Sequence, residues 1–207
     1  MIDYTIELIP NRMAQEMVVN YHYLHRRAPA MFSYGLFDGF TMIGCIIYGK
    51  PANKNLCWGV CGRDEANNVL ELTRLWILDG TPKNTESFLI GNSLRLLPAE
   101  FDIIVSYAEM DVGHVGTIYQ ATNWIYTGLS DKHIHWLLDG EKSKHSRHLF
   151  SEHGGIEGAK QFYGDRLQKH ERSRKHRYVM LRGNKKRKKE LLGKLRYPIS
   201  AYPKLEK

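Results

Sequence analysis

The stretch from Val69 to Leu97 most constrains the fold of this 207-residue chain. Its first part, Val69–Leu78, is a largely apolar run that predicts a strand, and a helix capped by Asn84 or Thr85 follows. The next segment, Phe101–Tyr107, is almost entirely apolar, as in a strand buried inside a sheet. Two strands joined by a crossover helix are parallel neighbours. We therefore expect an α/β fold with a mixed sheet and flanking helices.

The remaining segments predict further alternation of strands and helices. Asp38-Gly39 separates two apolar runs and is typical of a hairpin turn. The other expected strands are Tyr4–Ile9, Met31–Phe37, Phe40–Tyr48, Ile134–Leu138 and Arg177–Leu181, and the other expected helices are Asn11 to about His25, Gly113–Tyr126 and Asn184–Leu195.

Charge divides the chain unevenly. Residues 1–140 carry 10 Lys and Arg against 15 Asp and Glu, and residues 141–207 carry the other 20 against 7, so the net charges are −5 and +13. We interpret residues 1–140 as the α/β core and residues 141–207 as a basic C-terminal extension, packed on the core, that engages a polyanion. The run Lys185, Lys186, Arg187, Lys188 and Lys189 is the densest part of it and predicts salt-dependent binding of nucleic acid.

Several protein classes are excluded. No apolar run reaches the roughly 20 residues that cross a bilayer, and the N-terminus lacks the pattern of a signal peptide. Three sparse cysteines argue against a disulfide scaffold. Two of them, Cys57 and Cys61, form only half of a metal-site pattern, and we predict no metal ligands. The expected location is the cytoplasm, with no membrane partner.

The turn before the helix at Thr85 is the first candidate site. Backbone N–H groups at a helix N-terminus attract anions, and Lys83 adds a positive charge. The functional interpretation is a phosphate site for a donor or cofactor made by Lys83, Asn84, Thr85 and Ser87. An ordinary helix cap explains the same residues, and Glu86 opposes an anion there.

Arg74 lies within the predicted strand Val69–Leu78. A guanidinium keeps its proton and is costly to bury without a partner. It either forms a structural ion pair with Glu71 or Asp111, or holds a substrate anion or carbonyl.

Polar side chains follow the buried strand Phe101–Tyr107. Ligands of open α/β sheets gather at the carboxyl ends of strands, which makes candidates of Tyr107, Glu109 and Asp111. Tyr119 and Asn123 are candidates at helical spacing within the expected helix Gly113–Tyr126. Near the N-terminus, His22 and Tyr23 belong to the run YHYLHRR, whose mixture of aromatic and basic residues suits contact with bases and phosphates.

Taken together, YHYLHR, ELTRLWILDGTPKNTESFLI, SYAEMDVGHVGTIYQATNWIYTG, KHRYVMLRG and YPISAYPK resemble the Mom DNA-modification proteins of phage Mu and related phages. The core also resembles the GNAT acyltransferase fold, although Pro82–Ser87 stands in place of the glycine-rich Q/R-x-x-G-x-G/A loop. Mom proteins convert adenine in phage DNA to an N6-carbamoylmethyl form that host restriction enzymes do not cut. The resemblance implies double-stranded DNA as partner and marks Arg74 and Tyr119 as the functional pair, with His22, Tyr23 and Glu109 as secondary residues.

The identity of the donor stays open. The resemblance to GNAT enzymes implies acetyl-CoA, which supplies two carbons but not the nitrogen of a carbamoylmethyl group. An activated glycine, such as a glycyl-tRNA, contains both carbons and a nitrogen, and tRNA would then be a second partner. In our working model Tyr119 is an acid, Arg74 fixes the donor, Glu109 or Asp111 orients adenine or accepts a proton, and His22, Tyr23, Tyr107 and Asn123 bind the substrate. A conventional acetyl-CoA-dependent N-acetyltransferase and a non-catalytic DNA-binding protein are the alternatives, and a homo-oligomer is compatible with the sequence.

Overall fold

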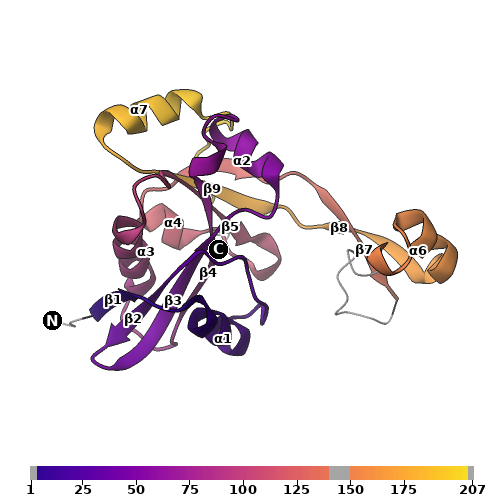
Figure 1. The fold of residues 1–207 in the computed structure, drawn as a ribbon, viewed down its shortest axis with the longest axis horizontal. Helices are drawn as coiled ribbons and strands as arrows, with labels where there is room; N and C mark the ends of the chain where they lie inside the picture. The colour runs from indigo at the N-terminus through magenta and orange to yellow at the C-terminus, as the bar shows by residue number, and fades with distance from the viewer. Residues whose placement is uncertain (1–3, 140–149, 205–207) are drawn as a thin grey trace. The chain divides into compact units, whose positions relative to one another are not determined.

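Two sheets organise the chain in the computed structural model, which describes residues 4–139 and 150–204. The larger sheet has seven strands in the order β1-β2-β3-β4-β5-β9-β6, and the smaller one pairs β7 with β8 (Figure 1). The strands are β1 (Tyr4–Leu8), β2 (Phe32–Asp38), β3 (Thr41–Gly49), β4 (Val69–Ile77), β5 (Ile103–Glu109), β6 (Ile125–Leu129), β7 (His133–Leu138), β8 (Leu167–Arg172) and β9 (Lys175–Leu181).

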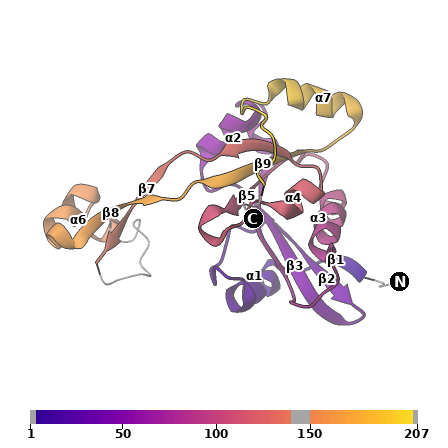
Figure 2. The ribbon, with the colours of Figure 1, turned by 180° about the vertical axis from the view of Figure 1, so that it is seen from behind.

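Helices cover both faces of the seven-stranded sheet. On one face, α3 and α4 pack over the largest apolar cluster, and on the other α1, α2 and α7 cover two smaller clusters (Figures 1 and 2). The helices are α1 (Asn11–Tyr21), α2 (Lys54–Cys61), α3 (Thr85–Leu96), α4 (Thr117–Ala121), α6 (Ile156–Tyr163) and α7 (Lys185–Lys194), with short 3-10 turns at Ala66–Asn68, Met110–Val112 and Gly164–Arg166. No helix in the described residues is long and apolar enough to span a bilayer.

The central prediction is confirmed. β4 and β5 are parallel neighbours joined through α3, and β2 and β3 form an antiparallel hairpin around the turn at Gly39, whose φ is +57°. The sheet is mixed, because β1 to β4 pair antiparallel and β4 pairs parallel with β5.

The expected helix over Gly113–Tyr126 is wrong for most of its length. Helix α4 covers only Thr117–Ala121, and the chain then turns at Asn123, whose φ is +60°. The reversal places Trp124 fully in the core and lets Ile125–Leu129 form strand β6 at the sheet edge. Asn123 and Tyr126 therefore do not share a helix face with Tyr119. Helix α2 is a further difference, because no helix is expected at Lys54–Cys61 from the sequence.

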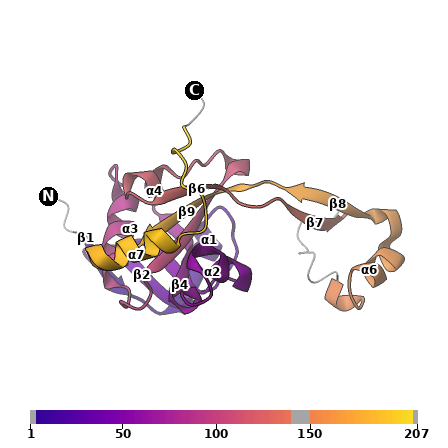
Figure 3. The same ribbon diagram turned by 90° about the horizontal axis from the view of Figure 1, so that it is seen from above.

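The expected boundary at residue 140 does not divide the structure, and Gly140 itself lies outside the described residues. Strand β9 inserts between β5 and β6, and Figure 3 shows it beside β6. Its Tyr178 and Val179 are fully buried. Within the described residues, contacts divide the chain into one unit of residues 4–108, 114–128 and 176–204 and another of residues 109–113, 129–139 and 150–175. The end of the basic third thus completes the larger unit's sheet, because β9 ends in the apolar run Tyr178–Leu181.

The smaller unit consists of the antiparallel pair β7 and β8 with α6. Its apolar centre is formed by Leu138, Ala159 and Leu167. The strand expected at Ile134–Leu138 is confirmed as β7, whereas α6 and β8 were not predicted.

Candidate active site

A β-bulge in β4 sets the direction of Arg74. Arg74 pairs with Ile47 of β3 and Leu72 pairs with the next residue, Tyr48, so Thr73 is an extra residue in β4. Leu72 before the bulge and Leu75 after it both pack into the cluster under α3, which places Arg74 on the opposite face, that of α1. The Arg74 Nη1 donates to the Thr73 carbonyl oxygen at 2.6 Å. The sequence alone leaves this face undetermined.

His22 lies close enough to Arg74 for the charge of the guanidinium to act on its ring. It follows the last residue of α1 and is 7% exposed, and its Nδ1 accepts a hydrogen bond from the Leu24 N–H at 3.1 Å. Burial foremost, and then the charge of Arg74, lower the His22 pKa to about 4. The imidazole is therefore neutral at pH 7 and carries its proton on Nε2.

Aromatic rings surround this pair. Tyr21 stacks on Trp76 with centroids 5.2 Å apart, and Tyr23 stacks on His22 at 4.3 Å. His114 meets Tyr23 edge-on at 5.7 Å. Tyr21 and Trp76 were not predicted as site residues. The signal that could have found Trp76 is its position two residues after Arg74 in the same strand, on the same face.

β4 and β5 stop pairing three residues before Arg74. Their parallel register ends at Glu71 and Val105, although β4 continues to Ile77 and β5 to Glu109. Just beyond the last pair, the Ser106 Oγ lies 3.0 Å from the Leu72 carbonyl oxygen and 2.7 Å from the Tyr119 hydroxyl oxygen. The carbonyl only accepts, so when Ser106 donates to it, Tyr119 donates to Ser106. Ser106 was not predicted as a site residue.

Tyr119 is 6% exposed, and its hydroxyl is a weak acid held in its neutral form. Burial is the main cause that raises its pKa to about 12, and Tyr23 and Glu71 raise it further, while the bond to Ser106 opposes them. Tyr23, which raises the Tyr119 pKa, also stacks on His22. It therefore connects Tyr119 with the group around Arg74. At neutral pH the Tyr119 hydroxyl serves as a donor of a hydrogen bond or a proton.

The structure does not bring all of the predicted site residues together. Glu109 forms an ion pair with Lys175, and Asp111 is exposed in the 3-10 turn; both belong to the smaller unit. Tyr107 packs against the apolar cluster under α2, and Asn123 is exposed in the turn between α4 and β6.

The first turn of α3 shows the bonds of an ordinary helix start. Thr85 Oγ1 donates to the Pro82 carbonyl oxygen at 2.6 Å, and Ser87 Oγ donates to that of Asn84 at 2.9 Å. Asn84 precedes the helix with φ +74° and forms no side-chain cap. Lys83 is exposed and Glu86 lies in the same turn. The side chains of this turn thus contribute one cation and one carboxylate beside the backbone N–H groups that begin α3.

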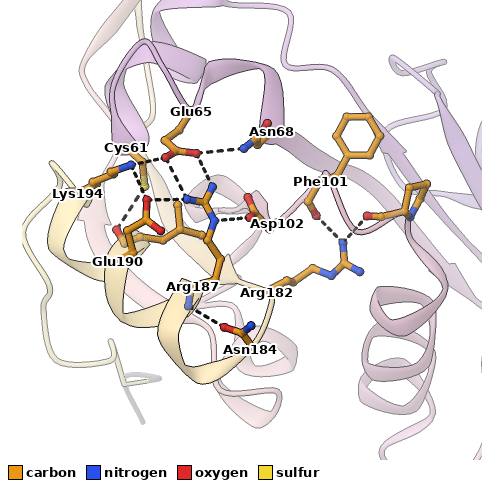
Figure 4. Close-up of polar contacts among 12 residues, drawn as sticks. Cys61, Glu65, Asn68, Phe101, Asp102, Arg182, Asn184, Arg187, Glu190 and Lys194 are labelled. Atoms are coloured by element: carbon orange, nitrogen blue, oxygen red, sulfur yellow. Dashed lines mark hydrogen bonds and ion pairs between the residues drawn. The ribbon is translucent and has the colours of Figure 1, made fainter.

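Arg187 departs from the expected role of its basic run. Its guanidinium bonds Glu65 at 2.5 Å, Asp102 at 2.7 Å and Glu190 at 2.9 Å, and Lys194 also reaches Glu65 (Figure 4). The Glu65 side chain is 7% exposed, and the bond to Arg187 is the main cause that holds its pKa at about 2. We correct the assignment of Arg187. It holds α7 on the core, because its charge is neutralised by carboxylates of the protein.

Other arginines of the basic third also form hydrogen bonds within the protein. Arg182 donates to the carbonyl oxygens that end α3, at Leu97 and Pro98, and the buried Arg177 bonds Thr127. By contrast, Lys185, Lys186, Lys188 and Lys189 are exposed on α7. The cationic surface of this helix is therefore smaller than the net charge of the segment indicates.

In the part of the chain that the structure describes, no three His, Cys, Asp or Glu side chains gather as a metal site. Cys57 and Cys61 are free thiols on α2, and burial raises the pKa of Cys61 to about 11.

Comparisons with known proteins agree with this architecture. The chain is 28% identical over 203 residues to "Methylcarbamoylase mom" of Escherichia phage Mu, covering 96% of this chain and 83% of that protein. Among solved structures, a proposed phosphinothricin N-acetyltransferase has a TM-score of 0.51 at 11% identity, covering 88% of this chain and 100% of that one. A GNAT-family acetyltransferase of Streptococcus pneumoniae has a TM-score of 0.48 at 8% identity, covering 87% of this chain and 100% of that one.

The first of these structural matches shows a GNAT-like fold, as the sequence predicted. The model of the Mom protein family matches residues 3–204. The chain is thus a member of the Mom protein family, built on a GNAT-like sheet.

Proposed function

We propose that this protein modifies DNA, converting the N6 amine of adenine to its carbamoylmethyl form and so protecting phage DNA from host restriction enzymes in the host cytoplasm. The observation that carries the proposal is the placement of Arg74, in a chain of the Mom family, among exposed aromatic rings and beside a neutral buried His22. The relative's name, methylcarbamoylase, describes transfer of a group that has the same atoms as a carbamoylmethyl group.

The reaction requires an exposed base and a particular set of atoms. Adenine N6 is unreachable inside a duplex, so the base must leave the stack. The product contains N6–CH₂–C(O)–NH₂, whereas acetyl transfer gives N6–C(O)–CH₃ and lacks a nitrogen. Acylation of N6 by glycine gives the isomer N6–C(O)–CH₂–NH₂, which has the same atoms as the product. To become the product, its bond from N6 to the carbonyl carbon and its CH₂–NH₂ bond must break, and an N6–CH₂ bond and a bond from the carbonyl carbon to NH₂ must form. An activated glycine, such as glycyl-tRNA, is therefore the proposed donor, because it supplies both carbons and the nitrogen.

The chain's own groups have complementary roles. Arg74 is a permanent cation that holds the donor carbonyl oxygen, and Tyr119 supplies a proton or hydrogen bond to the leaving group. For that, Tyr119 must turn its proton from Ser106 toward the substrate, and Ser106 then donates to Tyr119. The four exposed lysines of α7 contact the phosphates of double-stranded DNA.

Mass spectrometry of nucleosides tests the proposal against its alternatives. DNA from cells that express the chain is digested, and modified deoxyadenosine is compared with a synthetic N6-carbamoylmethyl standard by retention and fragmentation, because the glycyl isomer has the same mass. A DNA-binding protein leaves every nucleoside unchanged. A conventional acetyltransferase leaves DNA unchanged and consumes acetyl-CoA with another amine.

The donor is tested with purified protein, DNA and one donor at a time. We expect modification with glycyl-tRNA. Activity with acetyl-CoA as the sole donor would show the donor assignment to be wrong.

A further inference from the structure

The ring of Tyr21 is held in place yet left open to solvent. Tyr21 is the last residue of α1, and its ring stacks on Trp76 at 5.2 Å with planes only 25° apart. Trp76 is itself packed against the apolar cluster under α1, whereas Tyr21 is 59% exposed. One side of the Tyr21 ring is therefore backed by a fixed ring and the rest faces solvent, which is costly for an aromatic surface without a partner.

A second ring repeats this arrangement two residues later. Tyr23 is 48% exposed and stacks on the buried ring of His22 at 4.3 Å, with planes 26° apart. In each case an exposed tyrosine lies on a ring that the core immobilises. Rings ordered in this way lose little conformational entropy when another flat group stacks on them.

Positive charge accompanies the two rings. Arg26 and Arg27 are exposed in the segment after Tyr23. That segment is anchored by Gln15, whose amide donates to the Ala28 carbonyl oxygen at 2.5 Å and accepts from its N–H at 3.1 Å. Aromatic platforms near exposed cations are the combination that binds unpaired nucleic acid strands, since bases stack on rings and phosphates contact cations.

We propose that Tyr21 and Tyr23 form a stacking platform for unpaired bases, with Arg26 and Arg27 on the phosphates of the same strand. The platform rests on the proposed function and deepens it: the form of DNA that this site takes up is a strand whose bases have already left the duplex stack. Tyr21 lies on the rim of the group around Arg74 and is not a catalytic residue. It binds bases without reading their sequence, because every base has a flat face.

The platform is tested by the affinity of the purified full-length protein for a fluorescent oligothymidylate and for a hairpin duplex of similar length. Thymidine carries no adenine amine, so this binding is independent of the reaction. We expect Tyr21→Leu to weaken binding of the single strand about tenfold and to change binding of the duplex little. Tyr21→Phe keeps the ring and should bind as the wild type does. Phe40→Leu, which removes an exposed ring from the turn between β2 and β3, is the matched control and should have no effect.

The outcomes separate the platform from the modification activity. Weaker single-strand binding in Tyr21→Leu supports the platform even if no modified nucleoside is ever found. Wild-type single-strand affinity in Tyr21→Leu overturns it, whatever the chain does to adenine. An equal loss in Phe40→Leu also overturns it, because any exposed ring would then serve. Thermal melting of each variant confirms that the comparison is between folded proteins.

Discussion

The hydroxyl oxygens of Tyr119 and Ser106 lie 2.7 Å apart where β4 and β5 stop pairing. If Tyr119 supplies the proton of the reaction, Tyr119→Phe abolishes modification while the protein stays folded. Removing the hydroxyl loses one buried hydrogen bond, so the free energy of unfolding should fall by only about 1 kcal/mol. Urea unfolding and nucleoside analysis of the same preparation measure the two effects.

Ser106→Ala is the matched variant. It removes the same hydrogen bond, together with the one to the Leu72 carbonyl oxygen, but keeps the Tyr119 hydroxyl, so it should retain measurable modification. A loss as complete as that of Tyr119→Phe would show that the bond, rather than the Tyr119 proton, is what the reaction needs.

His22 should make the stability of the protein depend on pH. Its pKa is about 4 in the folded chain against 6.5 when unperturbed, so the unfolded state binds the proton first as the pH falls. Stability from this group is complete above pH 6.5 and decreases between pH 6.5 and about 4, by about 3 kcal/mol at most. The measurement is urea unfolding across this range for the wild type and for His22→Gln, whose amide oxygen still accepts from Leu24. His176, whose pKa burial also lowers, contributes equally to both proteins. Parallel curves for the two would contradict the assignment.

Arg187 should matter for stability and its neighbour Lys186 should not. Arg187→Ala leaves the nearly buried Glu65 with only Lys194 as its charged partner, and we expect a loss of about 3 kcal/mol. Lys186→Ala changes an exposed residue and should stay within about 0.5 kcal/mol. Denaturant unfolding of the two variants compares them, and equal losses would mean that the ion pairs around Glu65 contribute nothing specific.

The exposed lysines of α7 should govern the salt dependence of DNA binding. Replacing Lys185, Lys186, Lys188 and Lys189 by Gln should weaken binding of duplex DNA. It should also reduce the slope of log affinity against log salt by about 0.9 for each DNA phosphate that the protein no longer neutralises. Replacing the same four by Arg keeps the charge and should preserve the slope. An unchanged slope in the Gln variant would place the DNA-binding surface elsewhere.

The sequence predicted the parts of the fold that depend on local pattern. The apolar run of β4, the helix after Asn84 and the apolar run of β5 together specify a parallel pair, because a crossover helix leaves few other arrangements. The end of α4 did not follow from pattern alone, since Asn123 in a left-handed conformation and the burial of Trp124 depend on tertiary contacts.

Long-range contacts decided the remaining differences. The direction of Arg74 depends on one extra residue at Thr73, which the local sequence does not mark. Arg187 and its lysine neighbours belong to one basic run, and only the arrival of Glu65 and Asp102, 122 and 85 residues away, separates their roles. The resemblance to the Mom family, in contrast, was readable over nearly the whole chain and is confirmed.

The most direct test of the account is nucleoside mass spectrometry of DNA from cells that express the wild type, Arg74→Ala or Tyr119→Phe at equal levels. We predict deoxyadenosine that matches the N6-carbamoylmethyl standard in the wild type, and unmodified deoxyadenosine in both variants. Unmodified DNA from cells with abundant folded wild-type protein would contradict the proposed activity, and wild-type modification in either variant would remove that residue from the mechanism.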